Sequence, residues 1–125
     1  MLDASALLCL INGEPGAERV LRVLKDYAVS TVNVAEVIAK RIDFGEAYDQ
    51  LVQDISDLDL EIVEPDFSQA VLSGQMRAQT RNIGLSLGES AYLALAKSIG
   101  ATALTTDRAW LSLADTIGVS VELVR

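Results

Sequence analysis

Four carboxylates stand where predicted strands end or predicted helices begin: Asp3, Glu36, Glu89 and Asp107. Two carboxylates about 4 Å apart repel by roughly 4 kcal/mol at an effective dielectric near 20. If the four acids meet, they raise one another's pKa unless a cation joins them. An all-oxygen cluster suits Mg²⁺ or Mn²⁺, and a water bound to such an ion can attack a phosphodiester. The residue types therefore indicate metal-assisted hydrolysis.

Each acid also has an ordinary structural explanation. Asp3 and Asp107 can cap the helices that follow them. Two acids can fill the third position of a capping box: Glu36 after Asn33, and Glu89 after Ser86. Capping is sufficient to explain each acid considered alone. Four acids at one predicted edge of the sheet, however, favour a metal site.

The chain has no histidine and a single cysteine, Cys9. The lack of histidine excludes His-based acid–base chemistry, Ser-His-Asp and Cys-His catalysis, and zinc held by Cys and His. Cys9 lies in an apolar helical stretch, where we expect a small buried hydrophobe. Carboxylates, hydroxyls, amines or a hard metal ion remain for any chemistry.

Size and composition indicate one soluble domain spanning residues 1–125 of the 125-residue chain. No apolar run approaches the length of a membrane span, and no signal-peptide pattern opens the sequence. We therefore expect a cytoplasmic protein without a membrane partner.

The formal net charge of −8 by itself opposes binding to nucleic acid. Its distribution weakens that objection, because residues 42–76 hold nine acids and no base. The rest of the chain has nine acids and all ten bases. If four of those nine acids bind metal, the remaining surface is basic.

Short apolar strands alternate with amphipathic helices along the chain. Helices are predicted over residues 4–11, 15–27, 33–45, 46–58, 66–82 and 86–99. Strands are predicted over residues 28–31, 60–63, 101–106 and 119–124, and Met1–Asp3 supplies only a stub of a first strand. Pro15 is placed in the first turn of its helix, and Asp66 with Gln69 forms a capping box.

This alternation predicts an α/β fold with a mainly parallel sheet covered on both faces. Ligands of such sheets collect at the carboxyl edge of the strands. Asp3, Glu36 and Asp107 lie at or just beyond strand ends, and Glu89 lies in the first turn of a helix. We therefore expect the four acids to converge.

Four blocks of sequence carry a family resemblance: L-D-A-S-A-L-L at 2–8, S-T-V-N-V-A-E-V at 30–37, L-S-L-G-E-S-A-Y-L-A-L-A at 85–96 and L-T-T-D-R-A-W at 104–110. Together, in this order, they resemble PIN-domain ribonucleases, most closely the VapC-type toxins of bacterial toxin–antitoxin pairs. The resemblance covers nearly the whole chain. It implies a single PIN-like domain with a three-layer α/β/α fold.

The resemblance also implies roles for residues. The family's acidic quartet, which is catalytic and binds Mg²⁺ or Mn²⁺, falls on the four carboxylates named above. Its supporting polar positions fall on Ser5, Asn33 and Thr105. Two departures stand out: the third acid is usually aspartate but is Glu89 here, and the first strand is shorter than in relatives.

The activity implied by the resemblance is that of a metal-dependent endoribonuclease, in which a metal-activated water cleaves RNA. The implied partners are a cognate antitoxin that silences the toxin and a second copy of the chain in a homodimer.

Basic and aromatic residues supply further expectations. Arg108 directly follows the fourth acid and is the first candidate for contact with an RNA phosphate. Lys40 is expected to pair with Glu36 four residues earlier. Tyr92 and Trp110 are expected to pack in a core or interface rather than to stack on a base.

Two other interpretations differ in function. A PIN-like domain that binds RNA or protein without cutting it is favoured by Glu89 and by the short first strand. A phosphoacceptor receiver-like domain would need paired acids after the first strand and a lysine after a late strand, and the sequence has neither.

Overall fold

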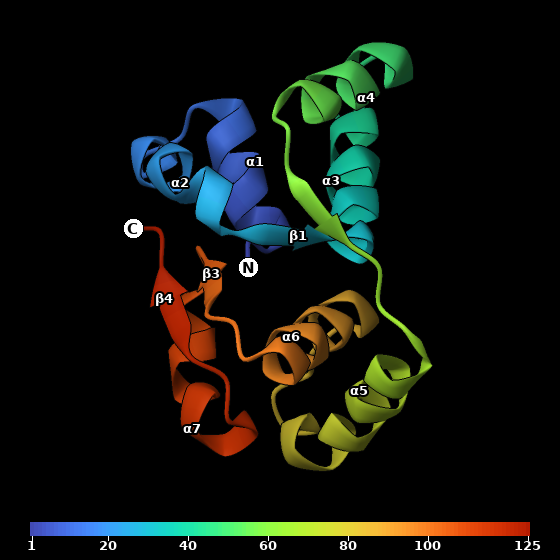
Figure 1. Cartoon of the computed structure of the whole chain (residues 1–125), viewed down its shortest axis with the longest axis vertical. Coiled ribbons are helices and arrows are strands. Elements are labelled where there is room, and N and C mark those ends of the chain that lie inside the picture. Colours follow the sequence, from blue (N-terminus) through green and yellow to red (C-terminus); the bar gives the residue numbers. More distant parts are fainter.

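The computed structural model describes all residues from Met1 to Arg125 (Figure 1). Its four short strands are β1 (Ala28–Ser30), β2 (Glu61–Val63), β3 (Ala103–Thr105) and β4 (Val121–Leu123). β1 pairs with β2 and β3 with β4, both in parallel. Leu2 joins the two pairs through parallel bridges to Val29 and Leu104. The sheet order is therefore β2-β1-Leu2-β3-β4, and the predicted stub is a single bridging residue.

Seven α-helices and two 3₁₀-helices connect these strands. The α-helices are α1 (Ala4–Asn12), α2 (Ala17–Val23), α3 (Thr31–Asp43), α4 (Tyr48–Asp57), α5 (Phe67–Thr80), α6 (Leu87–Ile99) and α7 (Ala114–Ile117). The 3₁₀-helices are η1 (Leu24–Asp26) and η2 (Arg108–Ser112). None of the helices is both long and apolar enough to cross a membrane.

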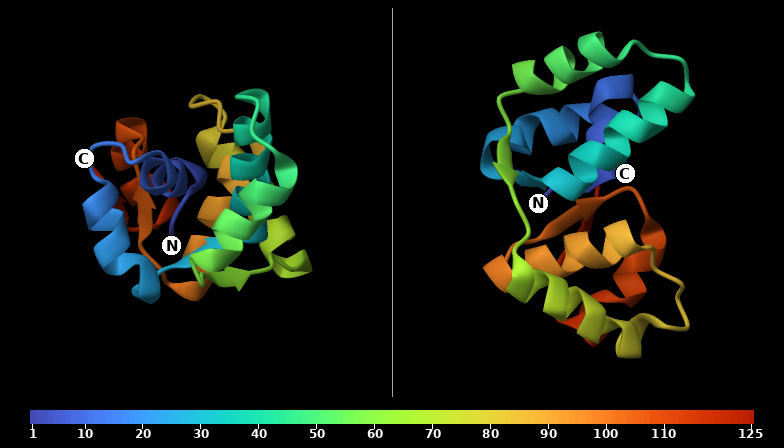
Figure 2. Two further views of the ribbon diagram at one scale, coloured as in Figure 1. Left: turned by 90° about the horizontal axis from the view of Figure 1, so that it is seen from above. Right: turned by 90° about the vertical axis from the view of Figure 1, so that its right-hand side faces the viewer.

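Helices cover both faces of the sheet, as Figures 1 and 2 show. Because successive strand residues face opposite sides, neighbours such as Ala103 and Leu104 belong to different cores. α1 to α4 pack with Leu2 and Leu104 on one face. α5, α6 and α7 pack with Met1 and Ala103 on the other. The predicted three-layer α/β/α fold with a parallel sheet is confirmed.

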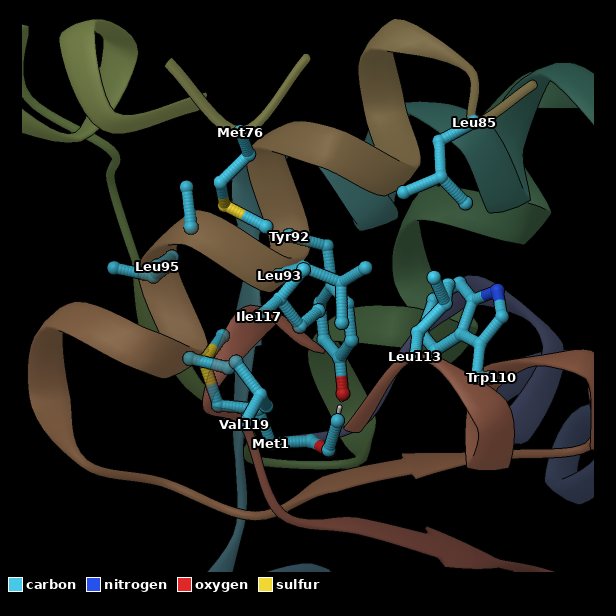
Figure 3. Packing of buried hydrophobic residues seen from close by; sticks show 13 residues of the cluster. Met1, Met76, Leu85, Tyr92, Leu93, Leu95, Trp110, Leu113, Ile117 and Val119 are labelled. Carbon is cyan, nitrogen blue, oxygen red and sulfur yellow. Dashed lines mark hydrogen bonds between the residues drawn. The ribbon is translucent and has the colours of Figure 1, made fainter. Parts of the chain in front are cut away.

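α6 contributes several buried residues to the core that it forms with α5 and α7 (Figure 3). Its residues from Tyr92 to Ala96 are all buried, so this part of the helix is covered on every side. The Tyr92 hydroxyl donates a 2.7 Å hydrogen bond to the Met1 carbonyl. Burial raises the pKa of Tyr92 well above its usual value, so the phenol keeps this donor proton. The bond ties α6 to the segment that carries Asp3.

The start of α3 differs from the sequence prediction. Ser30, the last residue of β1, is the N-cap, and its side chain accepts a hydrogen bond from the Val32 amide at 3.2 Å. Asn33 therefore lies inside the helix and is 2% exposed. The prediction that Asn33 caps this helix with Glu36 as its box partner is wrong, because the strand turns directly into the helix three residues earlier.

The second helix is also shorter than predicted. α2 begins after Gly16, so Pro15 lies outside its first turn, and the chain continues as η1 after Val23. Gly16 has φ +101°, and a Cβ there would lie 2.5 Å from Cγ1 of Val124. The positive φ and the close approach of Val124 at the exit of β4 thus both favour glycine at this position. The capping box of Asp66 and Gln69, in contrast, is present as predicted.

Two glycines with positive φ provide a matched test of that close approach. Gly13 has φ +64° with open space around it, whereas Gly16 is crowded by Val124. Gly13→Ala should cost about 1–2 kcal/mol of stability through left-handed backbone strain alone. Gly16→Ala should cost at least about 1 kcal/mol more, because overpacking is added. Urea unfolding of both variants measures the difference, and equal losses would contradict the packing described.

Candidate active site

A pocket of about 350 Å³ opens at the carboxyl edge of the sheet and contains all four candidate acids. Its lining consists of Asp3, Ala4, Ser5, Asn33, Glu36, Lys40, Glu89, Thr106, Asp107 and Trp110. Asp3 follows the bridging residue Leu2 and caps α1. Asp107 follows β3 and caps η2. Glu36 and Glu89 come from α3 and α6, so four separate segments deliver the carboxylates.

Asp3 is the most firmly held of the four acids and is 5% exposed. Ser5 Oγ lies 2.7 and 2.9 Å from its two carboxylate oxygens. Thr105 Oγ1 donates to it at 2.6 Å, and the Ala6 amide at 2.7 Å. Three donors thus fix the carboxylate, and the cap predicted for Asp3 is present.

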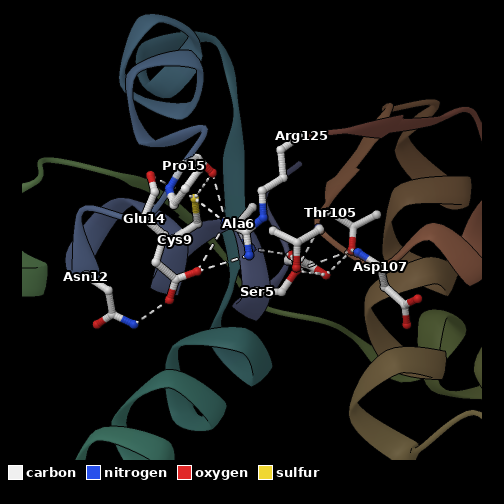
Figure 4. Close-up of polar contacts among 11 residues, drawn as sticks. Ser5, Ala6, Cys9, Asn12, Glu14, Pro15, Thr105, Asp107 and Arg125 are labelled. Carbon is white, nitrogen blue, oxygen red and sulfur yellow. Dashed lines mark hydrogen bonds and ion pairs between the residues drawn. The ribbon is translucent and has the colours of Figure 1, made fainter.

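The same two hydroxyls also fix the loop after β3 (Figure 4). Ser5 Oγ accepts from the Thr106 amide at 2.9 Å, and Thr105 Oγ1 accepts from the Asp107 amide at 3.0 Å. The hydroxyls therefore link the first acid to the backbone that carries the fourth. Ser5 and Thr105, two of the predicted supporting residues, both contact Asp3.

Burial raises the pKa of Asp3 above its ordinary value, and the charge of Glu36 raises it further. Hydrogen bonds from Thr105, Ala6 and Ser5 oppose this shift because they favour the charged form. The ionised carboxylate is thus oriented by donors but lacks a compensating charge of opposite sign, which a bound cation would supply.

Glu36 and Asp107 have local partners. Lys40 Nζ lies 3.9 Å from Glu36 Oε1, which confirms the expected pairing across one helical turn. Because Lys40 lies on the pocket wall and is half exposed, this ion pair is weak. Asp107 Oδ1 accepts from the Ala109 amide at 2.9 Å, which confirms its capping role.

Glu89 differs from the other three acids. Its backbone amide donates to Ser86 Oγ at 3.1 Å, so Ser86 caps α6 as predicted. The Glu89 carboxylate makes no hydrogen bond or ion pair, so only this half of the predicted capping box forms. The half-buried side chain lies on the pocket wall without a polar partner.

Two buried polar atoms on residues of the pocket wall have no hydrogen-bond partner: Asn33 Oδ1 and Trp110 Nε1. An unsatisfied buried donor or acceptor costs about 1–3 kcal/mol, so both atoms favour occupancy of the pocket by a polar ligand or a rotated side chain. Trp110 packs on Tyr92 with ring centroids 5.5 Å apart, which confirms the core packing expected for both aromatics.

Besides Ala4, three residues of the pocket wall had no site role predicted from the sequence: Lys40, Thr106 and Trp110. Lys40 shares a helical face with Glu36, which was the available signal. Thr106 directly follows the supporting Thr105. Trp110 carried no signal, because an indole in an apolar segment predicts core packing and not proximity to acids.

The donor chemistry of the pocket fits a hard divalent cation, since every candidate ligand is an oxygen and Asn33 adds an unpaired acceptor. No three acids stand close enough to hold one ion together in this arrangement. Glu36 and Glu89 lie on half-exposed helical positions. The side chains of Glu36 and Glu89 must therefore rotate before three or more of the acids can coordinate one ion.

Arg108 lies beside this pocket but is not part of its wall. It is exposed on η2, and its Nη2 lies 3.4 Å from the carbonyl oxygen of Arg125. A larger cavity of about 600 Å³ between α5 and α6 contains none of the four acids. We regard the smaller, acidic pocket as the candidate active site because all four candidate acids line it.

Comparison with known proteins gives one family and several similar folds. Residues 1–115 match the PIN domain model. Solved structures with a similar fold include DNA-bound VapBC from Salmonella typhimurium (18% identity, TM-score 0.77, covering 100% of this chain and 97% of that one). VapBC-1 from nontypeable Haemophilus influenzae is also similar (21% identity, TM-score 0.74, 99% and 96%). A search of curated proteins gives no significant match.

Thr105→Val tests how Asp3 is held, since valine keeps the shape and removes the hydroxyl that donates to Asp3 at 2.6 Å and accepts from the Asp107 amide at 3.0 Å. We expect a loss of about 1.5–3 kcal/mol, the range for a bond to a charged group. The bond to Asp3 favours the ionised form of that residue, so its removal raises the already elevated folded-state pKa further and costs most stability where Asp3 is ionised. The loss should therefore shrink as the pH falls through the Asp3 pKa.

Thr116→Val, at an exposed position of α7, is the matched control and should change stability by less than about 0.5 kcal/mol. Urea unfolding at neutral and acidic pH measures both variants. Equal, small effects at the two positions would show that the Thr105 hydroxyl does not hold Asp3.

Proposed function

This chain belongs to the PIN domain family, and on that premise we propose that it is a metal-dependent endoribonuclease, the toxin of a VapC-type toxin–antitoxin pair. Proteins of this family are generally nucleases. The observation that carries the proposal is the gathering of four carboxylates from four separate segments in one pocket of a protein without histidine.

In this proposal Asp3, Glu36, Glu89 and Asp107 hold Mg²⁺ or Mn²⁺. A bound ion of this kind supplies an activated water and offsets the charge that develops on the phosphodiester. The raised pKa of Asp3 supports the assignment, because a buried anion without a cation is unfavourable.

The protein's own groups have separate tasks. Asp3 is oriented before any ligand arrives, because Ser5, Thr105 and the Ala6 amide already hold it. Glu36 and Glu89 are half-buried on the pocket wall, where they could orient the attacking water and accept its proton. Asp107 is exposed at the rim, where the RNA backbone would pass.

Cations near the rim are the proposed contacts for RNA phosphates. Arg108 is exposed directly beside Asp107, and Lys40 lies on the pocket wall in a weak ion pair. The acidic segment 42–76 contributes no residue to this pocket, so its charge does not oppose RNA there.

The partner we propose is a cognate antitoxin that blocks the pocket, and we expect the toxin to form a homodimer in the cytoplasm. The support is the fold similarity to chains from VapBC complexes, including VapBC2 of Rickettsia felis bound to a promoter DNA fragment (18% identity, TM-score 0.75, covering 98% of this chain and 96% of that one).

A PIN-like domain that binds RNA or protein without cutting it is the second candidate. Glu89 in place of the family's usual aspartate favours it, and so does the spacing of the acids, of which no three are poised for one ion. Calorimetry with Mn²⁺ separates the two functions, because a silent scaffold need not bind the metal.

We expect the protein to cleave structured RNA with Mg²⁺ or Mn²⁺ and to stop when a chelator is added. Asp3→Asn should lower the cleavage rate by at least about 100-fold, because the buried ligand loses its charge. Asp115→Asn makes the same charge change at an exposed position outside the pocket and should cleave normally. Gel assays with labelled RNA measure the rates, and full activity of Asp3→Asn would refute the site.

Arg108→Ala tests the proposed contact with phosphate. Its loss should weaken RNA binding and reduce the slope of log K against log salt by about 1, as expected for one phosphate contact. Binding of an RNA oligonucleotide, measured at several salt concentrations, gives both quantities. An unchanged slope would remove Arg108 from the interface.

A further inference from the structure

One hydrogen-bond donor and two acceptors on the wall of the acidic pocket have no partner, and one of the acceptors is Asn33 Oδ1. The other acceptor is the Glu89 carboxylate, the only one of the four acids without a hydrogen bond or ion pair. The donor is Trp110 Nε1–H, which is buried and has no partner. Both residues line the same pocket, and Trp110 is 3% exposed. An unpaired donor and an unpaired acceptor thus belong to two residues on the wall of one pocket.

Packing on α6 brings the two residues to the same side. Glu89 lies three residues before Tyr92, so the two side chains share a face of the helix. The Trp110 ring packs on Tyr92 at a centroid distance of 5.5 Å. In Figure 3 the indole nitrogen lies on the edge of the ring that faces away from Tyr92. The donor therefore lies outside the aromatic contact, on a residue that lines the same pocket as Glu89.

The other acids of the pocket have acceptor atoms already in use. Asp3 accepts from Ser5, Thr105 and the Ala6 amide, and Asp107 accepts from the Ala109 amide. Glu36 faces Lys40. Rotation of the half-buried Glu89 side chain is the simplest movement that satisfies the indole.

On the basis of the proposed metal site, we propose that Trp110 is a positioning residue whose indole N–H donates a hydrogen bond to the Glu89 carboxylate. A carboxylate has two oxygens, so one can accept from the indole while the other faces a metal ion. Hydrogen bonds to a ligating carboxylate fix its orientation and commonly change metal affinity by about 10–100-fold. Trp110 thus holds the longer glutamate in the place that the family gives to aspartate.

The indole proton itself reports on this bond. Trp110 is the only tryptophan of the chain, so the ¹⁵N-labelled protein shows a single indole N–H resonance. In Glu89→Gln the resonance should move upfield, because a neutral amide oxygen is a weaker acceptor than a carboxylate. Glu36→Gln changes the other half-buried acid and should leave the resonance in place. Asn33→Ser tests the other unpaired acceptor, and a shift there without one in Glu89→Gln would overturn the proposal.

Calorimetry with Mg²⁺ provides the second measurement. Trp110→Phe keeps an aromatic ring and removes the N–H, and should weaken Mg²⁺ binding by about 10–100-fold. In a Glu89→Gln background the same change should have no further effect, since Trp110 acts through Glu89. Equal losses in both backgrounds would indicate a packing role and would overturn the proposal.

The outcomes separate this inference from the proposed function. Mg²⁺ binding without any response of the indole to Glu89→Gln would leave the nuclease assignment and overturn the role of Trp110. An indole that responds to Glu89→Gln in a protein that binds no Mg²⁺ would support the hydrogen bond and refute the metal site. If the protein binds no Mg²⁺ and the indole does not respond to Glu89→Gln, both the metal site and the hydrogen bond are refuted.

Discussion

The architecture of the candidate site depends on the burial of one carboxylate. Asp3 is withdrawn from water, and three donors hold it: two hydroxyls and the Ala6 amide. The hydroxyl of Thr105 belongs to β3, and that of Ser5 belongs to α1. The network can form only when the two segments meet beside Leu2, so the geometry of the acids is a product of sheet assembly.

The sheet is small, and helices supply most of its support. Each strand has three residues, and the N-terminal segment before α1 contributes a single bridging leucine, Leu2. Buried contacts on both faces compensate for the short ladder, with α6 lying against Met1 through the hydroxyl of Tyr92. Because the same helix carries Glu89 and packs on Trp110, the core and the pocket share one scaffold.

Several local features could be predicted from the sequence because they depend on neighbouring residues. Asp3 and Asp107 cap the helices that follow them, and the box of Asp66 with Gln69 is complete. The pairing of Lys40 with Glu36 follows from helical spacing alone. Two helix starts differ from the prediction: α2 begins after Gly16, which a distant residue, Val124, crowds, and α3 begins directly after Ser30, the last residue of β1.

The sequence by itself determined the chemistry available to this protein: oxygen ligands, no histidine, and acids placed after strands in an alternating α/β pattern. Only the tertiary structure decided how those acids differ. Burial and three donors fix Asp3, an exposed turn leaves Asp107 at the rim, and a free carboxylate on α6 stands in the same pocket as an unpaired indole. Such differences arise from solvent exclusion and from contacts across about 100 residues of chain, which no local pattern encodes.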